Sequence, residues 1–165
     1  MGVTASGRTR VLEAVRDAAR FDAGPLDRRL GYWLRRAQLA VFRDFFATFE
    51  SYDIRPAQYS ILTVIESNPG LKQGVVGEAL GIKRANFVAM IDELQGRGLV
   101  RRAPIPGDRR SHALVLTAEG ARLTAELHAV SDRHEGKLIA AIGETAYRDL
   151  FAPLNALARL GEGER

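Results

Sequence analysis

Two short runs of alternating apolar and polar residues constrain this chain most, one around Leu99 to Ala103 and one around Ala113 to Leu116. Alternation with a period of two predicts β-strands. We place Pro104-Ile105-Pro106-Gly107 in the loop between them, where prolines cost no ladder hydrogen bonds, and Asp108-Arg109-Arg110 at its tip. Arginines at a loop tip add little to a core, so this hairpin is suited to reach a negatively charged partner.

The remaining segments have the periodicity and end signals of helices. Proline is favoured at a first helical position, as at Pro56, and Thr117 is a good N-cap. A proline inside a helix removes one backbone hydrogen bond, so we expect a kink at Pro153. The predicted helices are an amphipathic one that ends at Gly24-Pro25, and others over Leu30 to Ser51, Pro56 to Asn68, Leu71 to about Gly81, Lys83 to Gly96 or Gly98, Thr117 to about Ile142, and Glu144 to Leu160.

The long helix from Leu30 to Ser51 is apolar on two sides. A single stripe is enough to face a core, so a helix that is apolar around most of its circumference needs two burial partners. In a chain of only 165 residues, another subunit is a candidate for the second burial partner. The first stripe comprises Leu30, Leu34, Ala37, Val41, Phe45 and Phe49, and the second Tyr32, Leu39, Phe42 and Phe46, with Trp33 between them.

Positive charge is concentrated in one segment. The whole chain carries +4, and the stretch from Lys83 to Arg110 contains seven basic and three acidic residues, a difference that equals the entire net charge. A basic stretch in an otherwise balanced chain is typical of a surface that binds a polyanion. A solvated surface that is rich in arginine would have the same composition, so charge alone leaves both interpretations open.

Composition and motifs argue against several classes of protein. The chain has no cysteine, which excludes disulfides and thiolate metal sites. It has no apolar run near the roughly 20 residues that span a bilayer and no secretory signal, so we expect a cytoplasmic location and no membrane partner. We find no catalytic nucleophile with a base and no cofactor motif, so we expect neither an enzyme nor a cofactor. His128, Asp132 and Glu135 share a helix face, but such sets are usually exposed ion pairs rather than metal sites.

The order of the central elements is short helix, turn, helix and charged hairpin, which is the order of a winged helix-turn-helix. The second helix of such a unit can enter the major groove, where each base pair shows a distinct pattern of donors and acceptors. The hairpin can reach the adjacent minor groove, whose negative potential attracts arginine. We therefore predict a mainly α fold with a small β-hairpin wing.

The segment from Leu94 to Gly120 resembles the MarR family of bacterial transcriptional regulators. The matching motifs are Leu-x-x-x-Gly-Leu-Val at the end of the second, or recognition, helix, Asp-Arg-Arg at the wing, and Leu-Thr-x-x-Gly at the start of the next helix. Residues 34–46, 55–62 and 91–94 are similar to the family's first, second and recognition helices. The resemblance covers about residues 30 to 160.

This resemblance implies a homodimer whose N- and C-terminal helices interlock and whose subunits each present one winged helix. It assigns residues 1–29 to a helical extension, 30–55 and 118–165 to dimerisation helices, and 56–117 to the DNA-binding region, within one compact domain. The exposed stripe Tyr147, Leu150, Phe151, Leu154 and Leu157 would then face the partner. The resemblance further implies a repressor that binds a pseudopalindromic double-stranded operator and is released by a small aromatic or acyl ligand.

The expected DNA-binding residues lie on the recognition helix and the wing. We expect Asp108 to support a wing arginine rather than to touch DNA, because a carboxylate beside phosphates is repelled. At most one of Arg101 and Arg102 should face DNA, and the other should pair with a carboxylate. The recognition helix has Asn86 and Ala89 where the family commonly has Thr and Arg. The expected DNA contacts are Lys83, Arg84, Ala85, Asn86, Val88, Ala89, Arg109 and Arg110.

Two further questions remain open at the level of sequence. Trp33, Arg36 and Tyr59 could line an effector pocket, but plain packing explains Trp33 and Tyr59 equally well. The winged helix could also serve as a protein-interaction module or as a non-specific architectural DNA binder. The charge on the recognition helix and wing favours sequence-specific DNA binding over both alternatives.

Overall fold

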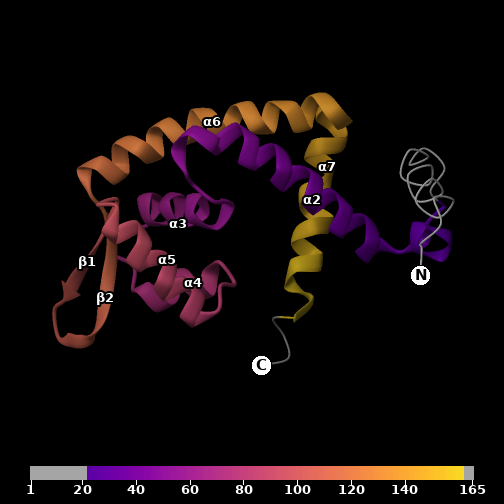
Figure 1. The fold of residues 1–165 in the computed structure, drawn as a ribbon. Helices are drawn as coiled ribbons and strands as arrows, with labels where there is room; N and C mark the ends of the chain where they lie inside the picture. The colour runs from indigo at the N-terminus through magenta and orange to yellow at the C-terminus, as the bar shows by residue number, and fades with distance from the viewer. Residues whose placement is uncertain (1–21, 162–165) are drawn as a thin grey trace, which may run out of the picture. The chain divides into compact units, whose positions relative to one another are not determined.

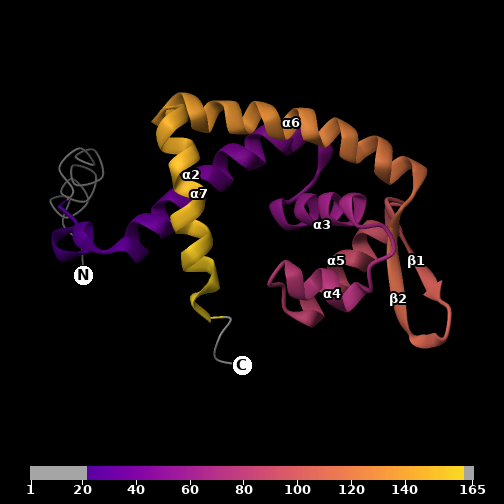
Figure 2. The same cartoon turned by 180° about the vertical axis from the view of Figure 1, so that it is seen from behind.

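The computed structural model describes residues 22–161, so the helix expected before Gly24 lies almost wholly outside the described residues. The chain divides into two compact units, one that ends at Ala40 and one that begins at Val41. Figures 1 and 2 show the elements from two sides. They are η2 (Gly24–Arg28), α2 (Leu30–Phe49), η3 (Glu50–Tyr52), α3 (Pro56–Ser67), α4 (Gln73–Ala79), α5 (Arg84–Gly96), β1 (Val100–Ile105), β2 (Asp108–Leu116), α6 (Ala118–Ile142), α7 (Glu144–Ala158) and η4 (Arg159–Gly161).

Local signals set the helix limits where the sequence predicts them. α3 has Pro56 at its first position, and its Gln58 side chain accepts a hydrogen bond from the Arg55 backbone N–H at 2.9 Å. The Thr117 hydroxyl accepts from the backbone N–H of Gly120 at 2.9 Å and caps α6. α5 ends at Gly96, and Gly98 follows with a φ of 71°, a left-handed conformation that favours glycine. These predicted boundaries are therefore confirmed.

The hairpin is longer than the sequence predicts. Ile105 pairs with Asp108, so the turn is only Pro106-Gly107, and the Asp108 to Arg110 segment belongs to β2 rather than to a loop. Pro104 lies inside β1 and pairs with His112. A two-stranded ribbon consists of edge strands, where a proline can sit without removing a ladder bond if its nitrogen faces away from the partner strand. The register shifts between Pro104 and Ile105, which is where the regular ladder is disturbed.

A single hydrophobic core lies within the unit that begins at Val41. α3 packs against α6, α4, and β2, and α5 packs against α4 and β1. Both ribbon views show α3 between α6 and the α4–α5 pair, with the hairpin beside them. The core residues come from every one of these elements, from the end of α2 and from two connecting segments: Phe45, Phe49, Ile54, Ile61, Leu62, Ile65, Val76, Phe87, Ile91, Leu94, Leu99, Val100, Leu114, Leu127 and Val130.

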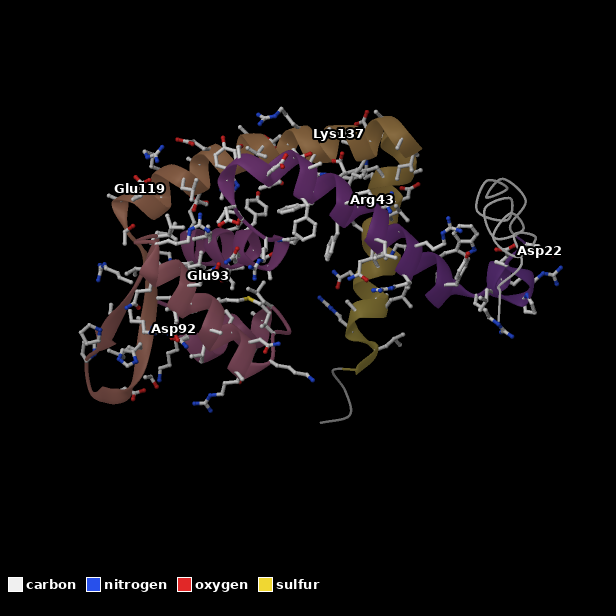
Figure 3. The ribbon with its side chains drawn as sticks, viewed as in Figure 1. Asp22, Arg43, Asp92, Glu93, Glu119 and Lys137 are labelled. Carbon is white, nitrogen blue, oxygen red and sulfur yellow. The ribbon has the colours of Figure 1, made fainter. Side chains whose placement is uncertain are left out.

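A polar cluster joins the C-terminal half of α2 to α6. The Asp44 carboxylate accepts a hydrogen bond from Lys137 at 2.9 Å and contacts Nδ1 of the buried His134 at 2.6 Å. Lys137, labelled on α6 in Figure 3, also donates to the Thr48 hydroxyl at 2.8 Å. The hydrogen bonds from Lys137 and His134 lower the pKa of Asp44 from 3.8 to about 2.

Large apolar side chains remain exposed on α2 and α7. Of the first α2 stripe, Phe45 and Phe49 enter the core, whereas Leu30 and Leu34 are exposed. Exposed members of the second stripe are Leu39, Phe42 and Phe46, and those of α7 are Leu150, Phe151 and Leu154. Large apolar side chains that are exposed together along one helix typically mark an interaction surface.

Candidate nucleic-acid interface

The helix α5 divides cleanly into a buried and an exposed side. Phe87, Ile91 and Leu94 are at most 2% exposed and anchor the helix in the core. The expected DNA-binding side chains of Lys83, Arg84, Ala85, Asn86 and Ala89 are all exposed, and that of Val88 is half-buried. The structure therefore leaves the recognition-helix residues that the sequence selected accessible to a ligand, in the first two turns of α5.

A groove separates the start of α5 from α4 and the hairpin. Its volume is about 440 Å³. Polar groups from three elements meet there, since Arg84 belongs to α5, Lys72 precedes α4, and His112 lies on β2. The recognition helix and the wing thus border one continuous surface rather than two separate ones. Its remaining lining residues are Gln73, Gly74, Val75, Gly77, Glu78, Ile82, Phe87, Val88 and Ser111.

The base of the wing is held by the backbone that precedes α4. The Leu114 backbone N–H donates to the Leu71 carbonyl at 2.9 Å, and the Gly70 N–H donates to the Leu114 carbonyl at 3.0 Å. A single bridge pairs Lys72 with Ala113. The residues between α3 and α4 therefore extend the hairpin by a short third strand-like segment. The sequence does not predict this segment, because it has no alternation of apolar and polar residues.

Asp108 has partners that the sequence did not suggest. Its carboxylate pairs with the Lys72 ammonium at 2.9 Å and accepts from the Ser111 backbone N–H at 3.1 Å. Lys72 thus tethers the turn-proximal end of β2 to the start of α4. The placement of Arg109 and Arg110 on β2 is described, whereas their side chains are not, so their contact with DNA and their support by Asp108 stay predictions.

The two arginines of β1 differ in environment. Arg101 is exposed, whereas the guanidinium of Arg102 pairs with the Asp92 carboxylate of α5 at 2.7 Å. Figure 3 labels Asp92 on α5, beside the hairpin. Arg102 also donates to the side-chain oxygens of Gln73 at 2.8 Å and Gln95 at 3.1 Å. The prediction that one arginine of this pair holds a carboxylate is confirmed.

Tyr59, one of the three expected effector residues, belongs to a polar chain between α3 and α6. Its hydroxyl lies 3.0 Å from Nδ1 of His128, whose Nε2 lies 2.6 Å from the Glu66 carboxylate. Its ring packs near Phe45 and Phe49. His128 therefore pairs with a carboxylate of another helix. Within residues 22–161, no group of three or more His, Cys, Asp or Glu side chains could hold a metal ion.

The other two effector candidates form a cluster in the unit that ends at Ala40. The Arg36 guanidinium lies 5.7 Å from the Trp33 ring centroid and donates to the Tyr32 hydroxyl at 2.9 Å. The Trp33 indole N–H donates to the Asp27 carbonyl at 2.8 Å, which fixes the ring while leaving it half exposed. An aromatic ring beside a guanidinium is suited to contact an aromatic or anionic molecule.

A helix-turn-helix whose second helix has an exposed side, followed by an arginine-rich hairpin, is the arrangement of winged-helix DNA-binding regulators. A sequence model of the MarR family matches residues 52–111. The chain is 31% identical over 144 residues to a putative transcriptional regulatory protein for the hcr operon of Thauera aromatica, with 87% of each chain covered. The chain belongs to the MarR family and is a DNA-binding transcriptional regulator.

Solved structures show the same fold over most of the chain. The transcriptional repressor CouR bound to a 23-mer DNA duplex is 42% identical, with a TM-score of 0.81, and covers 85% of this chain and 99% of its own. CouR bound to p-coumaroyl-CoA is 39% identical, with a TM-score of 0.78, and covers 86% and 99%. The predicted winged helix-turn-helix fold is thereby confirmed.

Within the described residues, no helix is long and apolar enough to cross a membrane.

Proposed function

We propose that the protein is a homodimeric repressor that binds a pseudopalindromic operator and leaves it when a small aromatic or acyl ligand binds. The observation that carries this proposal is the continuous surface formed by the exposed face of α5 and the hairpin. The similar repressor CouR has been solved on a DNA duplex, which supports the same use of this surface here. The protein acts by binding rather than by catalysis, and in the cytoplasm.

Recognition is divided between the two grooves of the DNA. Asn86 and Arg84 lie at the start of α5, where side chains can meet base edges in the major groove, and Ala85 and Val88 offer apolar contacts to thymine methyl groups. Lys83 and Ala89 border the same face. Arg109 and Arg110 on β2 enter or flank the minor groove, where arginine responds to groove width.

Dimerisation uses the apolar side chains that the chain leaves exposed. Phe42 and Phe46 on α2 and Phe151 and Leu154 on α7 are each at least 40% exposed, which is costly for a chain on its own. The proposed dimerisation region comprises residues 30–55 and 118–165, the DNA-binding region residues 56–117, and the N-terminal extension residues 1–29. A twofold dimer presents two recognition helices to half-sites about one helical turn apart, roughly 10 base pairs.

The candidate effector contacts are Trp33 and Arg36 in the unit that ends at Ala40 and, separately, Tyr59 in the unit that begins at Val41. Trp33 and Arg36 offer a ring and a guanidinium to a planar anion. Tyr59 offers a hydroxyl whose hydrogen bonding depends on His128. When the Nδ1 atom of neutral His128 carries no proton, it accepts the Tyr59 hydroxyl hydrogen, and the phenolic oxygen is then free to accept from a ligand. CouR is known with p-coumaroyl-CoA, so we propose an aromatic carboxylic acid or its thioester as the effector.

The test is a mobility-shift titration on DNA from upstream of the protein's own gene, with random duplexes of equal length as the control. We expect specific binding to be tighter by roughly 10³-fold or more at physiological salt. Equal affinity for both would indicate an architectural DNA binder. Absence of binding to either would favour a protein-interaction module.

The test of effector binding uses the fluorescence of Trp33, the single tryptophan in the sequence, as its probe. Aromatic acids and their CoA thioesters are titrated while Trp33 fluorescence and operator binding are followed together. We expect fluorescence to change and operator affinity to fall by about 5- to 150-fold in parallel. Release of the operator without any change at Trp33 would place the pocket elsewhere.

A further inference from the structure

The guanidinium of Arg102, on β1, has three side-chain partners. Its guanidinium donates from Nε to Gln73 at 2.8 Å, donates from one terminal nitrogen to Gln95 at 3.1 Å, and pairs through the other with Asp92 at 2.7 Å. These partners lie on different elements, because Gln73 opens α4 whereas Asp92 and Gln95 belong to α5. One side chain of β1 therefore joins the wing to both helices of the helix-turn-helix.

The geometry of this junction requires arginine. A guanidinium presents donors in a rigid planar fork and can serve several acceptors in fixed directions, whereas a lysine ammonium is a flexible point charge. The Arg102 side chain is only 21% exposed, against 59% for the Asp92 side chain, so solvent competes less at the arginine. A lysine at this position would keep the charge and lose the three-way geometry.

Asp92 makes the junction relevant to DNA. It follows Arg84, Ala85, Val88 and Ala89 on the exposed side of α5 at helical spacing, so its carboxylate borders the face proposed to meet DNA. A carboxylate near phosphates repels them. Arg102 neutralises this charge at a distance of 2.7 Å.

We infer that Arg102 is a positioning residue that fixes the angle between the wing and the recognition helix. We also infer that it shields the DNA from the negative charge of Asp92. By holding both elements, Arg102 decides which flanking base pairs the wing reaches while α5 reads the centre of each half-site. This inference rests on the proposed use of α5 and the wing in DNA binding. It adds a residue that sets operator specificity without touching a base.

The hairpin does not depend on Arg102 for its existence. β1 and β2 pair along their lengths, backbone hydrogen bonds join Leu114 to Leu71 and Gly70 at the wing base, and Lys72 pairs with Asp108 near the turn. Removing the Arg102 contacts should therefore change the angle of an intact wing. This separates a positioning role from a role in folding.

The experiment compares footprints of the full-length wild-type protein with those of Arg102→Gln and Arg102→Lys. The probe is the upstream DNA of its own gene, at protein concentrations that saturate each variant. Hydroxyl-radical cleavage reports minor-groove protection at the flanks, and dimethyl sulfate reports guanine N7 protection in the major groove. We expect both variants to lose flank protection, to keep central protection, and to bind about tenfold more weakly.

Arg101→Gln is the matched control, because it removes the neighbouring positive charge from the same strand. At saturating protein it should keep flank protection, even where the lost charge lowers its affinity for DNA. The double variant Arg102→Gln/Asp92→Asn should recover part of the lost affinity, because the repelling carboxylate is gone, while flank protection stays lost. A double variant no tighter than Arg102→Gln would overturn the shielding role.

Circular dichroism and thermal unfolding verify that each variant is folded. If a folded Arg102→Lys variant protects flanks and centre like the wild type, the positioning role is refuted. Loss of flank and central protection together at saturation would also refute it, since the effect would then not be specific to the wing. If the wild type itself gives no footprint, the proposed operator function fails, independently of Arg102.

Discussion

Gly120 of α6 lies so close to the backbone of Leu99 that a Cβ added at Gly120 would sit 1.9 Å from the Leu99 carbonyl oxygen and 2.8 Å from its carbonyl carbon. The same oxygen accepts from the Thr117 backbone N–H at 3.0 Å. The residue before β1 and the first turn of α6 are therefore in close backbone contact, and the absence of a Cβ at Gly120 leaves room for this contact. This contact explains why the glycine of the Leu-Thr-x-x-Gly motif is needed.

Replacing Gly120 by alanine should destabilise the protein, although alanine normally favours a helix. Backbone atoms at 1.9 Å must move, and overpacking of this kind costs about 1–3 kcal/mol. Gly136→Ala in the same helix is the control, since beyond the adjacent backbone of α6 no described residue has an atom within 4 Å of the added Cβ, and it should stabilise by up to about 1 kcal/mol. Urea unfolding measures both changes. Equal effects from the two substitutions would contradict the close approach to Leu99.

The Asp44 cluster predicts a loss of stability in acid. Hydrogen bonds from Lys137 and then His134 lower the folded-state pKa of Asp44 to about 2 from an ordinary 3.8. Because the folded pKa is the lower one, the stabilisation is complete above about pH 4 and disappears as the pH falls toward 2. The difference in unfolding free energy between wild type and Asp44→Asn should therefore shrink over that window. Lys137→Met should weaken the same pH dependence, and a difference that is constant with pH would rule out the Asp44 effect.

Asn86→Ala should reduce specificity more than general DNA affinity. Asn86 is exposed at the start of α5, where a side-chain amide can make paired hydrogen bonds to adenine. We expect a loss of about 1–3 kcal/mol on the operator and little change on random DNA. Anisotropy titrations on both duplexes measure this. A uniform loss on both would show that Asn86 contacts the backbone of the DNA instead.

Arg110→Ala should weaken binding to most sequences. A wing arginine that enters the minor groove neutralises phosphates and distinguishes mainly A·T from G·C pairs. The slope of log affinity against log salt should fall by up to about one per subunit. Preference among operators that differ at central positions should survive. Wild-type affinity and salt slope in this variant would mean that the wing does not reach the DNA.

Phe151→Asp should disrupt the dimer. Phe151 is 57% exposed on α7 and belongs to its apolar stripe, so a carboxylate there would be buried unpaired in a dimer interface. Sedimentation should then give the mass of one chain, and operator binding should weaken because two half-sites are no longer engaged together. Asp149→Ala, on another side of α7, serves as the control. A Phe151→Asp protein that remains a tight dimer would move the interface away from α7.

The sequence was most informative where structure depends on neighbouring residues. Pro56, Thr117 and Gly98 act on their own turn of backbone, so the helix limits they predict are the observed ones. The spacing of Phe87, Ile91 and Leu94 likewise determined which side of α5 faces the core, and hence which side is exposed. The family motifs extended this local knowledge to the winged-helix fold.

The hairpin and its anchors required the tertiary structure. Pro104 and Ile105 lie in β1 because a partner strand pairs with them, although their local sequence suggests a loop. No periodicity in the sequence predicts the contact between Arg102 and Gln73, which is 29 residues away. Nor does any predict the contact between Lys72 and Asp108, 36 residues away.

Alternation, caps and apolar spacing act within a few residues and are therefore written in the sequence itself. They determined that this chain forms a winged helix with an exposed recognition face. Other properties depend on contacts between elements that are distant in sequence. They are the proposed angle of the wing, the loss of stability in acid through Asp44, and the need for glycine at position 120. Those contacts exist only once the core has packed, because packing alone sets the distance and direction between side chains on different elements.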